Sequence, residues 1–442
     1  MPLAVSRLPL LHSADLARPV MWSQGRVVSA GELMQKFRAL AGLLPAGPYL
    51  VNLCEQRDHF IIAWGAALLR EQTNLLPSSR APGVVDEVIR DFDGSYRCDD
   101  AFVARAVVRN EAAVPADIAA EHLSVIAFTS GSTGLPKRQE KRWRTYQGSN
   151  LNNAARIRER LAPQYGAARP WIVATVPPQH MYGIETSVLL PLIGDMAVHG
   201  GRPLFPADVV SALAEVPEPR VLVTTPVHLR ALVESGLRFP DIALVISATA
   251  PLDAAQATAV ERVLNTEVLE MFGSTETCVF ATRSTAREES WRPYAGITLQ
   301  PQDEGTLVDA PWFEASTPLQ DVIETQADGR FKVRGRNADM VEVAGKRASL
   351  ADLTRRLLSV PGVEDAVVFQ PEAAAVGAVR RVAALVVAPA LTAQSISEKL
   401  SILVDPAFMP RPLVLVQALP RNELGKLPRD RLLASLNGGT AQ

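Results

Sequence analysis

The segment richest in groups that can contact phosphate is VIAFTSGSTGLPK, residues 125–137. A strand-like apolar run leads into hydroxyl side chains and glycines, and the segment ends in a lysine. Glycines let backbone N–H groups approach phosphate oxygens closely, and hydroxyls add further donors. We expect phosphate contacts from Thr129, Ser130, Gly131, Ser132, Thr133 and Lys137. A surface loop of small residues is the plain alternative, and a Walker-type P-loop fits poorly because Leu135 and Pro136 separate Gly134 from Lys137.

A second candidate is EMFGSTET, residues 270–277, where a short apolar strand leads into Gly273 and Ser274. Ligands of open α/β sheets usually bind at the carboxyl ends of the strands. Thr275 could donate a hydrogen bond to a phosphate, and the Glu276 carboxylate could hold Mg²⁺. The alternative is a helix start capped by Ser274 or Thr275, because such strings often cap helices.

Two later segments, GRNADMVEVAGKR (335–347) and LPRNELGKLPR (419–429), complete an ordered set of four. Together the four resemble the motifs of the adenylate-forming superfamily, which includes acyl- and aryl-CoA synthetases, luciferases and the adenylation domains of peptide synthetases. The resemblance runs from about residue 124 to 430. It implies an enzyme that activates a carboxylic acid with ATP and Mg²⁺ and passes the acyl group to a thiol.

The resemblance also implies roles for single residues. Thr129 to Thr133 would hold the β- and γ-phosphates, while Thr275 and Glu276 would contact the α-phosphate and Mg²⁺, beside Gly273 and Ser274. Asp321 resembles the acid that binds both ribose hydroxyls, and Arg336 the arginine that assists it. Lys426 resembles the catalytic lysine that bridges the acyl carboxylate and the ribose–phosphate oxygens. Without the surrounding motif, we would interpret it as a solvated lysine of the C-terminal tail. Gly345 lies in the loop that lines the thiol tunnel in the family.

The acyl side of the site is expected around VPPQHMYGIE, where His180 resembles the residue at the mouth of the family's acyl pocket. The His-x-Tyr-Gly string looks most like aryl-CoA ligases, and adenylation domains for amino acids commonly carry an aspartate here. A lone histidine is also often structural. The expected lining is mostly apolar, which suits an aromatic or aliphatic acid, and simple core packing is its alternative. It comprises His180, Met181, Tyr182, Ser247, Ala248, Thr249, Ala250, Met271 and Phe272.

Several positions depart from the family pattern. Arg138 and Gln139 replace the glycine and small hydrophobe that usually follow the loop lysine, and Ala338 stands at the hinge. The short N-terminal region resembles compact ligases of aryl-polyene and xanthomonadin-type pigment pathways, which load a hydroxybenzoic acid onto an acyl carrier protein. Coenzyme A is the alternative acceptor, and a non-catalytic acyl- or nucleotide-binding protein is the rival class. Candidate residues for docking an acidic carrier are Arg347, Arg355, Arg356, Lys426 and Arg429.

The elements that must position these residues alternate between apolar strands and amphipathic helices. Strand-like runs at 171–176, 221–225 and 243–248, with a helical stretch at 252–264, predict an α/β fold with largely parallel, buried strands. From about residue 306 the pattern becomes β-rich, and a β-α-β-β-α-β rhythm follows. We therefore expect a large N-terminal α/β domain, 1–337, with a β-rich closing section, and a small mobile α+β domain, 338–442, that carries Lys426.

The composition of the chain limits the partners and the cellular compartment that we expect for the protein. A net charge of −2 over 442 residues gives no reason to expect nucleic acid as a partner. The longest apolar stretch, near 60–69, is too short to span a bilayer. Three scattered cysteines and six histidines without metal-ligand spacing fit a cytoplasmic protein. One feature, the basic cluster Lys137-Arg138 with Lys141-Arg142, calls for a local explanation.

Overall fold

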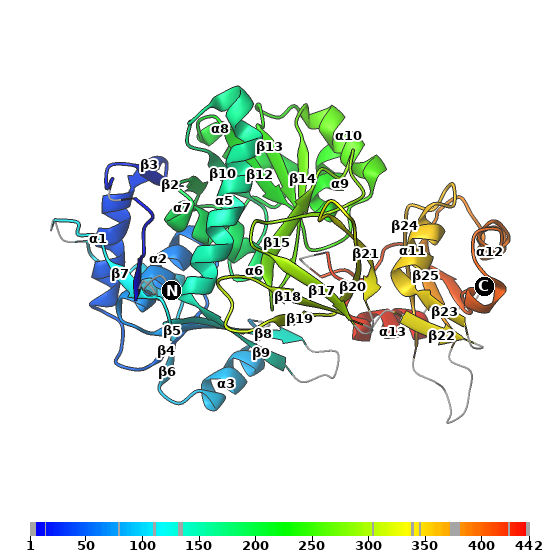
Figure 1. Cartoon of the computed structure of the whole chain (residues 1–442), viewed down its shortest axis with the longest axis horizontal. Coiled ribbons are helices and arrows are strands. Elements are labelled where there is room, and N and C mark those ends of the chain that lie inside the picture. The colour runs from blue at the N-terminus through cyan, green and yellow to red at the C-terminus, as the bar shows by residue number, and fades with distance from the viewer. Residues whose placement is uncertain are drawn as a thin grey trace. The chain divides into compact units, whose positions relative to one another are not determined.

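The structure is a computed structural model of the whole chain (Figure 1). It describes residues 6–13, 15–77, 80–108, 112–130, 136–302, 305–336, 340–343, 346–371, 381–422 and 425–438. The chain forms two compact units. The first comprises Met1–Thr298 and Asp309–Thr317, and the second comprises Leu299–Val308 and Pro318–Gln442. The expected domain boundary at 337/338 lies outside the described residues.

The largest element of the first unit is a nine-stranded sheet with the order β16-β15-β14-β13-β12-β10-β11-β2-β3. Its six strands from β14 to β2 pair in parallel, and antiparallel strands close both edges. The strands are β2 (Pro19–Ser23), β3 (Arg26–Ser29), β10 (Trp171–Ala174), β11 (Ala197–His199), β12 (Arg220–Thr224), β13 (Leu244–Ser247), β14 (Val268–Ser274), β15 (Cys278–Arg283) and β16 (Arg292–Pro293). The predicted strands at 171–176, 221–225 and 243–248 are therefore confirmed; β10 and β13 are slightly shorter than predicted, and β12 is shifted by one residue.

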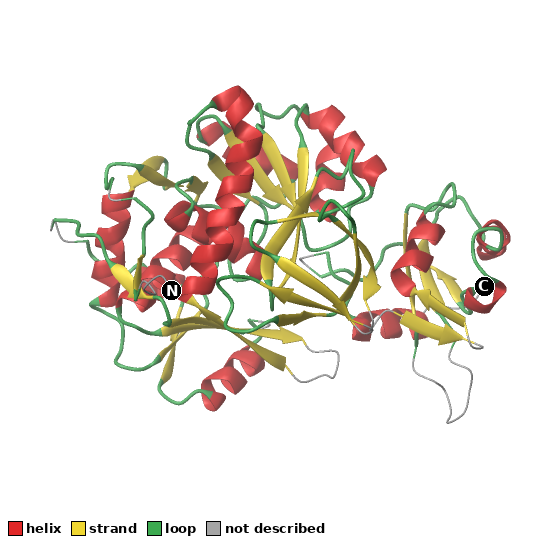
Figure 2. Cartoon of the chain, viewed as in Figure 1, coloured by secondary structure: helices red, strands yellow, loops and turns green. Residues whose placement is uncertain are grey.

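Both faces of this sheet are buried, because alternate side chains of one strand enter two different cores. In β12, Val221 and Val223 belong to one core and Leu222 to the other. Helices cover the two faces (Figure 2). One core takes side chains from α1 (Ala30–Ala41), α2 (Arg57–Leu69), α5 (Trp143–Tyr165), a π-helix (Ile184–Leu189) and α7 (Leu190–Ile193). The other takes them from α8 (Pro206–Glu215), α9 (Pro226–Glu234) and α10 (Ala254–Leu264).

A second sheet of this unit has five strands in the order β6-β4-β5-β8-β9. They are β4 (Tyr49–Asn52), β5 (Thr73–Leu76), β6 (Ser95–Cys98), β8 (Leu123–Ser130) and β9 (Pro136–Arg142), all parallel except for the β8–β9 pair. Helices α3 (Pro82–Asp91) and α4 (Asp100–Val103) and the antiparallel pair β1 (Arg7–Pro9) and β7 (Asp117–Ala119) complete this part. The short helix α6 (Met181–Gly183) follows β10.

The second unit is built from small sheets, as the change of pattern after residue 306 predicted. Its strands are β17 (Thr298–Gln302), β18 (Gly305–Asp309), β19 (Thr317–Leu319), β20 (Asp321–Thr325), β21 (Phe331–Arg336), β22 (Met340–Val343), β23 (Lys346–Ser349), β24 (Asp365–Phe369), β25 (Ala383–Val387) and β26 (Leu413–Leu415). Helices α11 (Leu350–Leu358), α12 (Ala393–Leu400) and α13 (Arg429–Gly438), with a 3-10 turn at Pro406–Phe408, accompany them. The fold class predicted from the sequence is therefore confirmed. Over the described residues, no helix is both long and apolar enough to cross a membrane.

Candidate active site

The GSTE segment forms the tight turn of a β-hairpin. Strand β14 ends at Ser274, β15 begins at Cys278, and the two strands pair antiparallel. The turn is closed by Ser274 and Thr277, because the Ser274 backbone N donates to Thr277 Oγ1 at 3.0 Å and the Thr277 N donates to Ser274 Oγ at 3.2 Å. A Cβ at Gly273 would lie 2.1 Å from the Cys278 carbonyl oxygen, so only glycine fits. The alternative of a helix start capped by Ser274 or Thr275 is therefore wrong.

The predicted phosphate-binding segment occupies the hairpin of β8 and β9. Thr129 pairs with Lys137 and Ser130 with Pro136. Gly131, Ser132 and Thr133 lie outside the described residues, as do the side chains of Thr129, Ser130 and Lys137. Their phosphate-binding role stays a prediction.

These two hairpins meet at Glu276. Gln139 Nε2, on β9, donates to Glu276 Oε1 at 3.2 Å, and Lys141 Nζ donates to the Glu276 carbonyl oxygen. Thr275 and Glu276 are both half-buried. The family resemblance predicted that the two motifs share one site. Nothing in the sequence indicated that Gln139 and Lys141 make the contacts between them.

The rest of the basic cluster has structural partners. The Arg138 guanidinium lies 4.7 Å from the centre of the Phe92 ring and 3.4 Å from Asp91 Oδ2. Arg142 pairs with Glu314. The local explanation is thus two outward-facing arginines and one buried lysine, and none of these contacts requires an anionic macromolecule as partner.

The loop that carries His180 is held by a buried arginine. Arg57 Nη2 donates to the carbonyl oxygens of Ala174 at 3.0 Å and Val176 at 2.6 Å, at the carboxyl end of β10. Burial, together with nearby Arg202, lowers the pKa of Arg57 to about 9. His180 itself is half-buried, and its carbonyl oxygen accepts from Ile184 N at 2.7 Å. The backbone at His180 is therefore fixed by the sheet and by the helix that follows.

The residues predicted to line the acyl pocket gather at the ends of β13 and β14. The Tyr182 hydroxyl donates to Ile246 O at 3.1 Å, and its burial raises its pKa well above the ordinary value. Ser247 is fully buried, and among the described residues its Oγ has no hydrogen-bond partner. Thr249 has a φ of 79°, which is strained for a β-branched residue. Such unsatisfied and strained groups gather at functional sites, so this corner of the sheet fits a ligand-binding role.

The other predicted lining residues lie on β14, directly after β13, or on α6. Met271 and Ala248 are buried, and Met181 and Ala250 are half-buried. The Phe272 ring packs against Trp291 in a tilted arrangement, with 4.9 Å between the ring centroids. Ser247 pairs with Glu270 across β13 and β14, which puts the two predicted stretches side by side. Their contact with an acyl group stays a prediction.

A buried carboxylate behind these residues was not predicted. Glu185, on the π-helix, accepts hydrogen bonds from Ser149 Oγ at 2.6 Å, Asn153 Nδ2 at 3.3 Å and Val279 N at 3.1 Å. Burial raises its pKa above the ordinary value, and these hydrogen bonds together with Lys141 oppose the rise. The only signal in the sequence is an acidic residue inside an apolar stretch, IETSVLLPL at 184–192.

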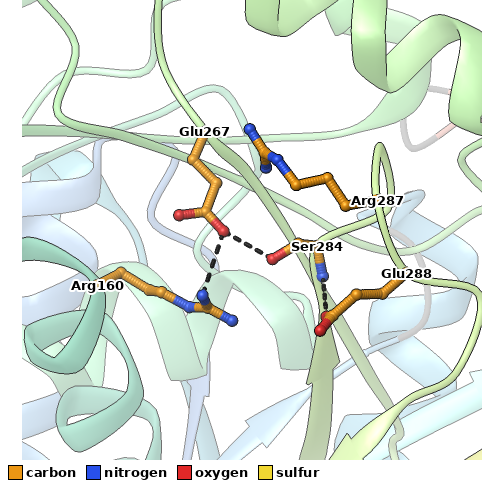
Figure 3. A pocket seen from close by; sticks show the side chains of 5 residues that line it. All are labelled: Arg160, Glu267, Ser284, Arg287 and Glu288. Carbon is orange, nitrogen blue, oxygen red and sulfur yellow. Dashed lines mark hydrogen bonds and ion pairs between the residues drawn. The ribbon is translucent and has the colours of Figure 1, made fainter.

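A separate pocket of about 310 Å³ opens elsewhere on the first unit (Figure 3). It is lined by Arg160, Glu267, Ser284, Arg287 and Glu288. Glu267 accepts from Ser284 Oγ at 2.6 Å and pairs with Arg160 at 3.5 Å. None of the predicted site residues lines it, and its opposite charges largely satisfy one another.

In the second unit, Asp321 and Arg336 are cross-strand partners on β20 and β21. The two residues expected at the ribose are thus brought together by the backbone. Asp321 is buried, and its carbonyl oxygen accepts from Thr306 Oγ1 at 2.8 Å. The Arg336 side chain lies outside the described residues.

Lys426 lies on an exposed but anchored loop of the same unit. Its backbone N donates to Asn422 Oδ1 at 2.9 Å, and its carbonyl oxygen accepts from Asn422 N at 2.8 Å. Arg421 ties this loop to β24 through three hydrogen bonds to Asp365, of 2.8, 3.0 and 3.2 Å. Gly345 and Ala338, expected at the thiol tunnel and the hinge, lie outside the described residues.

Three comparisons place the chain among known proteins. Residues 57–311 match the model of the AMP-binding enzyme family. The 4-coumarate–CoA ligase of Rhodobacter capsulatus is 28% identical over 249 residues, which are 55% of this chain and 60% of that relative. The chain therefore matches about three fifths of this relative's length.

Solved structures agree on the fold across the whole chain. ATP-bound MatB of Rhodopseudomonas palustris superposes with a TM-score of 0.80 at 17% identity, covering 96% of this chain and 97% of that one. The o-succinylbenzoate–CoA synthetase of Bacillus subtilis, bound to its acyl-adenylate, gives 0.79 at 17% identity, covering 95% and 96%. The family model matches more than half of this chain, and the chain therefore belongs to the AMP-binding enzyme family.

Proposed function

We propose that this protein is an AMP-forming acid–thiol ligase, which activates a carboxylic acid with MgATP and transfers the acyl group to a thiol. The observation that carries the proposal is the contact between Gln139 and Glu276. It joins the hairpin of the predicted phosphate segment to the turn of the predicted α-phosphate and Mg²⁺ contacts. Membership of the AMP-binding family supports the same reading.

The first step joins two anions. A carboxylate oxygen of the acid attacks the α-phosphorus of ATP, a mixed anhydride bond forms, and the bond to pyrophosphate breaks. Residues 129–133 and Lys137 would hold the leaving phosphates, and Thr275 would donate to the α-phosphate. Lys426 would offset the repulsion between the two anions, since a positioned cation stabilises charge that develops in the transition state. Asp321 and Arg336 would hold the ribose.

The Glu276 side chain fits a Mg²⁺ ligand. It is a half-buried carboxylate at the carboxyl end of a strand, and its amide partner Gln139 leaves its remaining oxygen sites available to a cation. No group of three His, Cys, Asp or Glu side chains that could hold a metal occurs among the described residues. Mg²⁺ is commonly bound by one or two carboxylates together with substrate phosphates and water. When bound, the ion would neutralise phosphate charge.

In the second step the thiol sulfur attacks the acyl carbon. A thioester bond forms, the anhydride C–O bond breaks, AMP leaves as an anion, and the thiol proton passes to solvent. Lys426 would have to withdraw before the thiol enters, through rotation of the small domain, and Gly345 would then line the thiol path. A lysine on a mobile domain can serve one half-reaction and leave the other open.

The proposed acid is an aromatic one of the hydroxybenzoate type. His180 stands where amino acid-activating relatives carry a charge partner, and the predicted lining offers only apolar surface and a few neutral polar atoms. The buried, unpaired Ser247 hydroxyl could bond a ring substituent. Two similar proteins are named for aromatic acids, 4-coumarate and o-succinylbenzoate.

For the thiol we propose an acyl carrier protein, with coenzyme A as the second candidate. Arg355, Arg356 and Arg429 are exposed, as a basic docking surface requires, but the first two already pair with Asp352. Lys426 is exposed as well, and the Arg347 side chain lies outside the described residues. Coenzyme A is favoured by the names of the similar proteins, which are CoA ligases.

A matrix of acids against acceptors tests the proposal. Benzoic, hydroxybenzoic, hydroxycinnamic and fatty acids are each combined with MgATP and either coenzyme A or a holo-carrier protein, and the thioester is detected by mass spectrometry. We expect AMP and a thioester with an aromatic acid. Equal turnover with both thiols would remove the carrier-specific version. Acid binding without pyrophosphate release for every acid would favour a non-catalytic binding protein.

A further inference from the structure

Lys141 is a buried lysine next to the expected phosphate site. Its exposed fraction is 5%, and its Nζ donates to the carbonyl oxygen of Glu276. Lysine is almost never fully buried unless its charge is paired or well hydrogen-bonded. A lysine held in this place therefore points to a specific task for its ammonium group.

Gln139 contacts the same turn and lies on the same face of β9 as Lys141. Side chains two residues apart on a strand point the same way, so Gln139 and Lys141 both reach Glu276, one at its carboxylate and one at its backbone. The intervening Glu140 is exposed. Together the pair fixes both the position of the Glu276 backbone and the orientation of its carboxylate.

The strand that follows the turn is held by a buried carboxylate. Glu185 accepts the backbone N–H of Val279, the residue that pairs with Gly273 across the hairpin. Cys278, between Glu276 and Val279, has a φ of 59°, a conformation that only surrounding contacts can maintain in a residue with a side chain. A buried lysine thus contacts the turn, and a buried carboxylate contacts the strand that follows it.

We infer that Lys141 and Gln139 are positioning residues that hold the Glu276 carboxylate ready for the metal–nucleotide complex. Both residues lie on β9, the second strand of the hairpin that carries the predicted phosphate-binding segment. They therefore connect that hairpin to the turn that carries Glu276. This inference rests on the proposed function. It assigns to Gln139, where the family usually has a small hydrophobe, a role that this chain's own geometry provides.

Calorimetric titration of ATP into the full chain, with and without Mg²⁺, tests the inference. The variants are Lys141→Met and Gln139→Leu, and the matched control is Arg142→Met, a cation on the opposite face of β9. We expect each of the two variants to lower the Mg²⁺-dependent gain in ATP affinity on the order of tenfold, the scale of one hydrogen bond to a charged group. ATP affinity without Mg²⁺ should stay near the wild-type value, and the control should match the wild type in both titrations.

A second comparison shows whether the residues act through Glu276. In a Glu276→Gln background, adding Lys141→Met should cause no further loss of the Mg²⁺-dependent gain. Gln139 is neutral and half-buried, so Gln139→Leu decides the matter if Lys141→Met does not fold.

Three results would overturn the inference. The first is an unchanged Mg²⁺-dependent gain in both variants, and the second is an equal loss of affinity with and without the ion. The third is a Lys141→Met variant that is destabilised, is rescued by Glu185→Gln, and binds MgATP like the wild type, since the lysine would then only neutralise the buried glutamate. A wild-type chain that binds no ATP would instead refute the proposed function.

Discussion

The Glu185 carboxylate accepts a hydrogen bond from the backbone N–H of Val279 at 3.1 Å, joining the helix after His180 to the strand after Glu276. The contact crosses 94 residues of sequence. It links the predicted acyl side of the site to the predicted nucleotide side through one buried carboxylate. Substitution of Glu185 should therefore lower the stability of the fold most, and should affect ligand binding on both sides of the site to a smaller extent.

The first prediction concerns Glu185 and pH. Burial raises its pKa above the ordinary value of about 4.5, so between that value and its raised pKa the folded chain binds more protons than the unfolded chain. The stability that protonated Glu185 contributes is therefore present at low pH and lost as pH rises through its raised pKa. Relative to Glu185→Gln, the wild type should become progressively less stable as the pH rises above about 4.5. Urea unfolding of both proteins measures this, and a pH-independent difference would contradict it.

The second prediction concerns the unpaired hydroxyl of Ser247. Removing a buried donor that has no partner costs little, so Ser247→Ala should unfold at the same or a slightly higher temperature. If the hydroxyl bonds a ring substituent, kcat/KM should fall roughly threefold to tenfold for hydroxybenzoates. Benzoate itself should be used equally well by both proteins. An equal fall for both acids would show that the residue acts by packing alone.

The third prediction concerns the glycine of the GSTE hairpin. Gly273→Ala places a methyl group against the Cys278 carbonyl, and we expect a loss of about 1–3 kcal/mol or more of stability. Gly83→Ala is the matched control, because nothing lies within 4 Å of the added carbon on α3. The control should be neutral or stabilising by up to about 1 kcal/mol. Thermal unfolding of the pair decides, and equal effects would mean that the hairpin relaxes freely.

The fourth prediction separates the two half-reactions. Lys426→Ala should lower acid-dependent adenylate formation by about 10²–10³, the usual effect of removing one charge-stabilising group. Thioester formation from a supplied acyl-adenylate should stay near the wild-type rate, because the lysine is then no longer needed at the phosphate. Single-turnover assays of each half-reaction measure this. If both fell alike, the rotation of the small domain would lose its main support.

The sequence predicted the elements well wherever one local pattern decided them. The apolar runs at 171–176 and 243–248 form the central strands β10 and β13, since short apolar runs are typical of strands buried on both faces of a sheet. The helical stretch predicted at 252–264 is α10, which begins two residues later and ends at the same residue. The adjacency of Asp321 and Arg336 agrees with their shared expected role.

Features that depend on distant partners were not predictable. Ser274 and Thr275 could have capped a helix, and only the pairing of β14 with β15 decides for a hairpin. The burial of Lys141 depends on a carbonyl group 135 residues away, which no local pattern encodes. Glu185 likewise has partners on α5 and β15 that the sequence does not place beside it.

The central claim is that the chain activates a carboxylic acid as its adenylate. Acid-dependent exchange of labelled pyrophosphate into ATP measures this step directly, without a thiol. We expect exchange that requires both Mg²⁺ and an aromatic acid and that is lost in Glu276→Ala and Lys426→Ala. Absence of exchange with every acid of the panel, or formation of ADP in place of AMP, would contradict it.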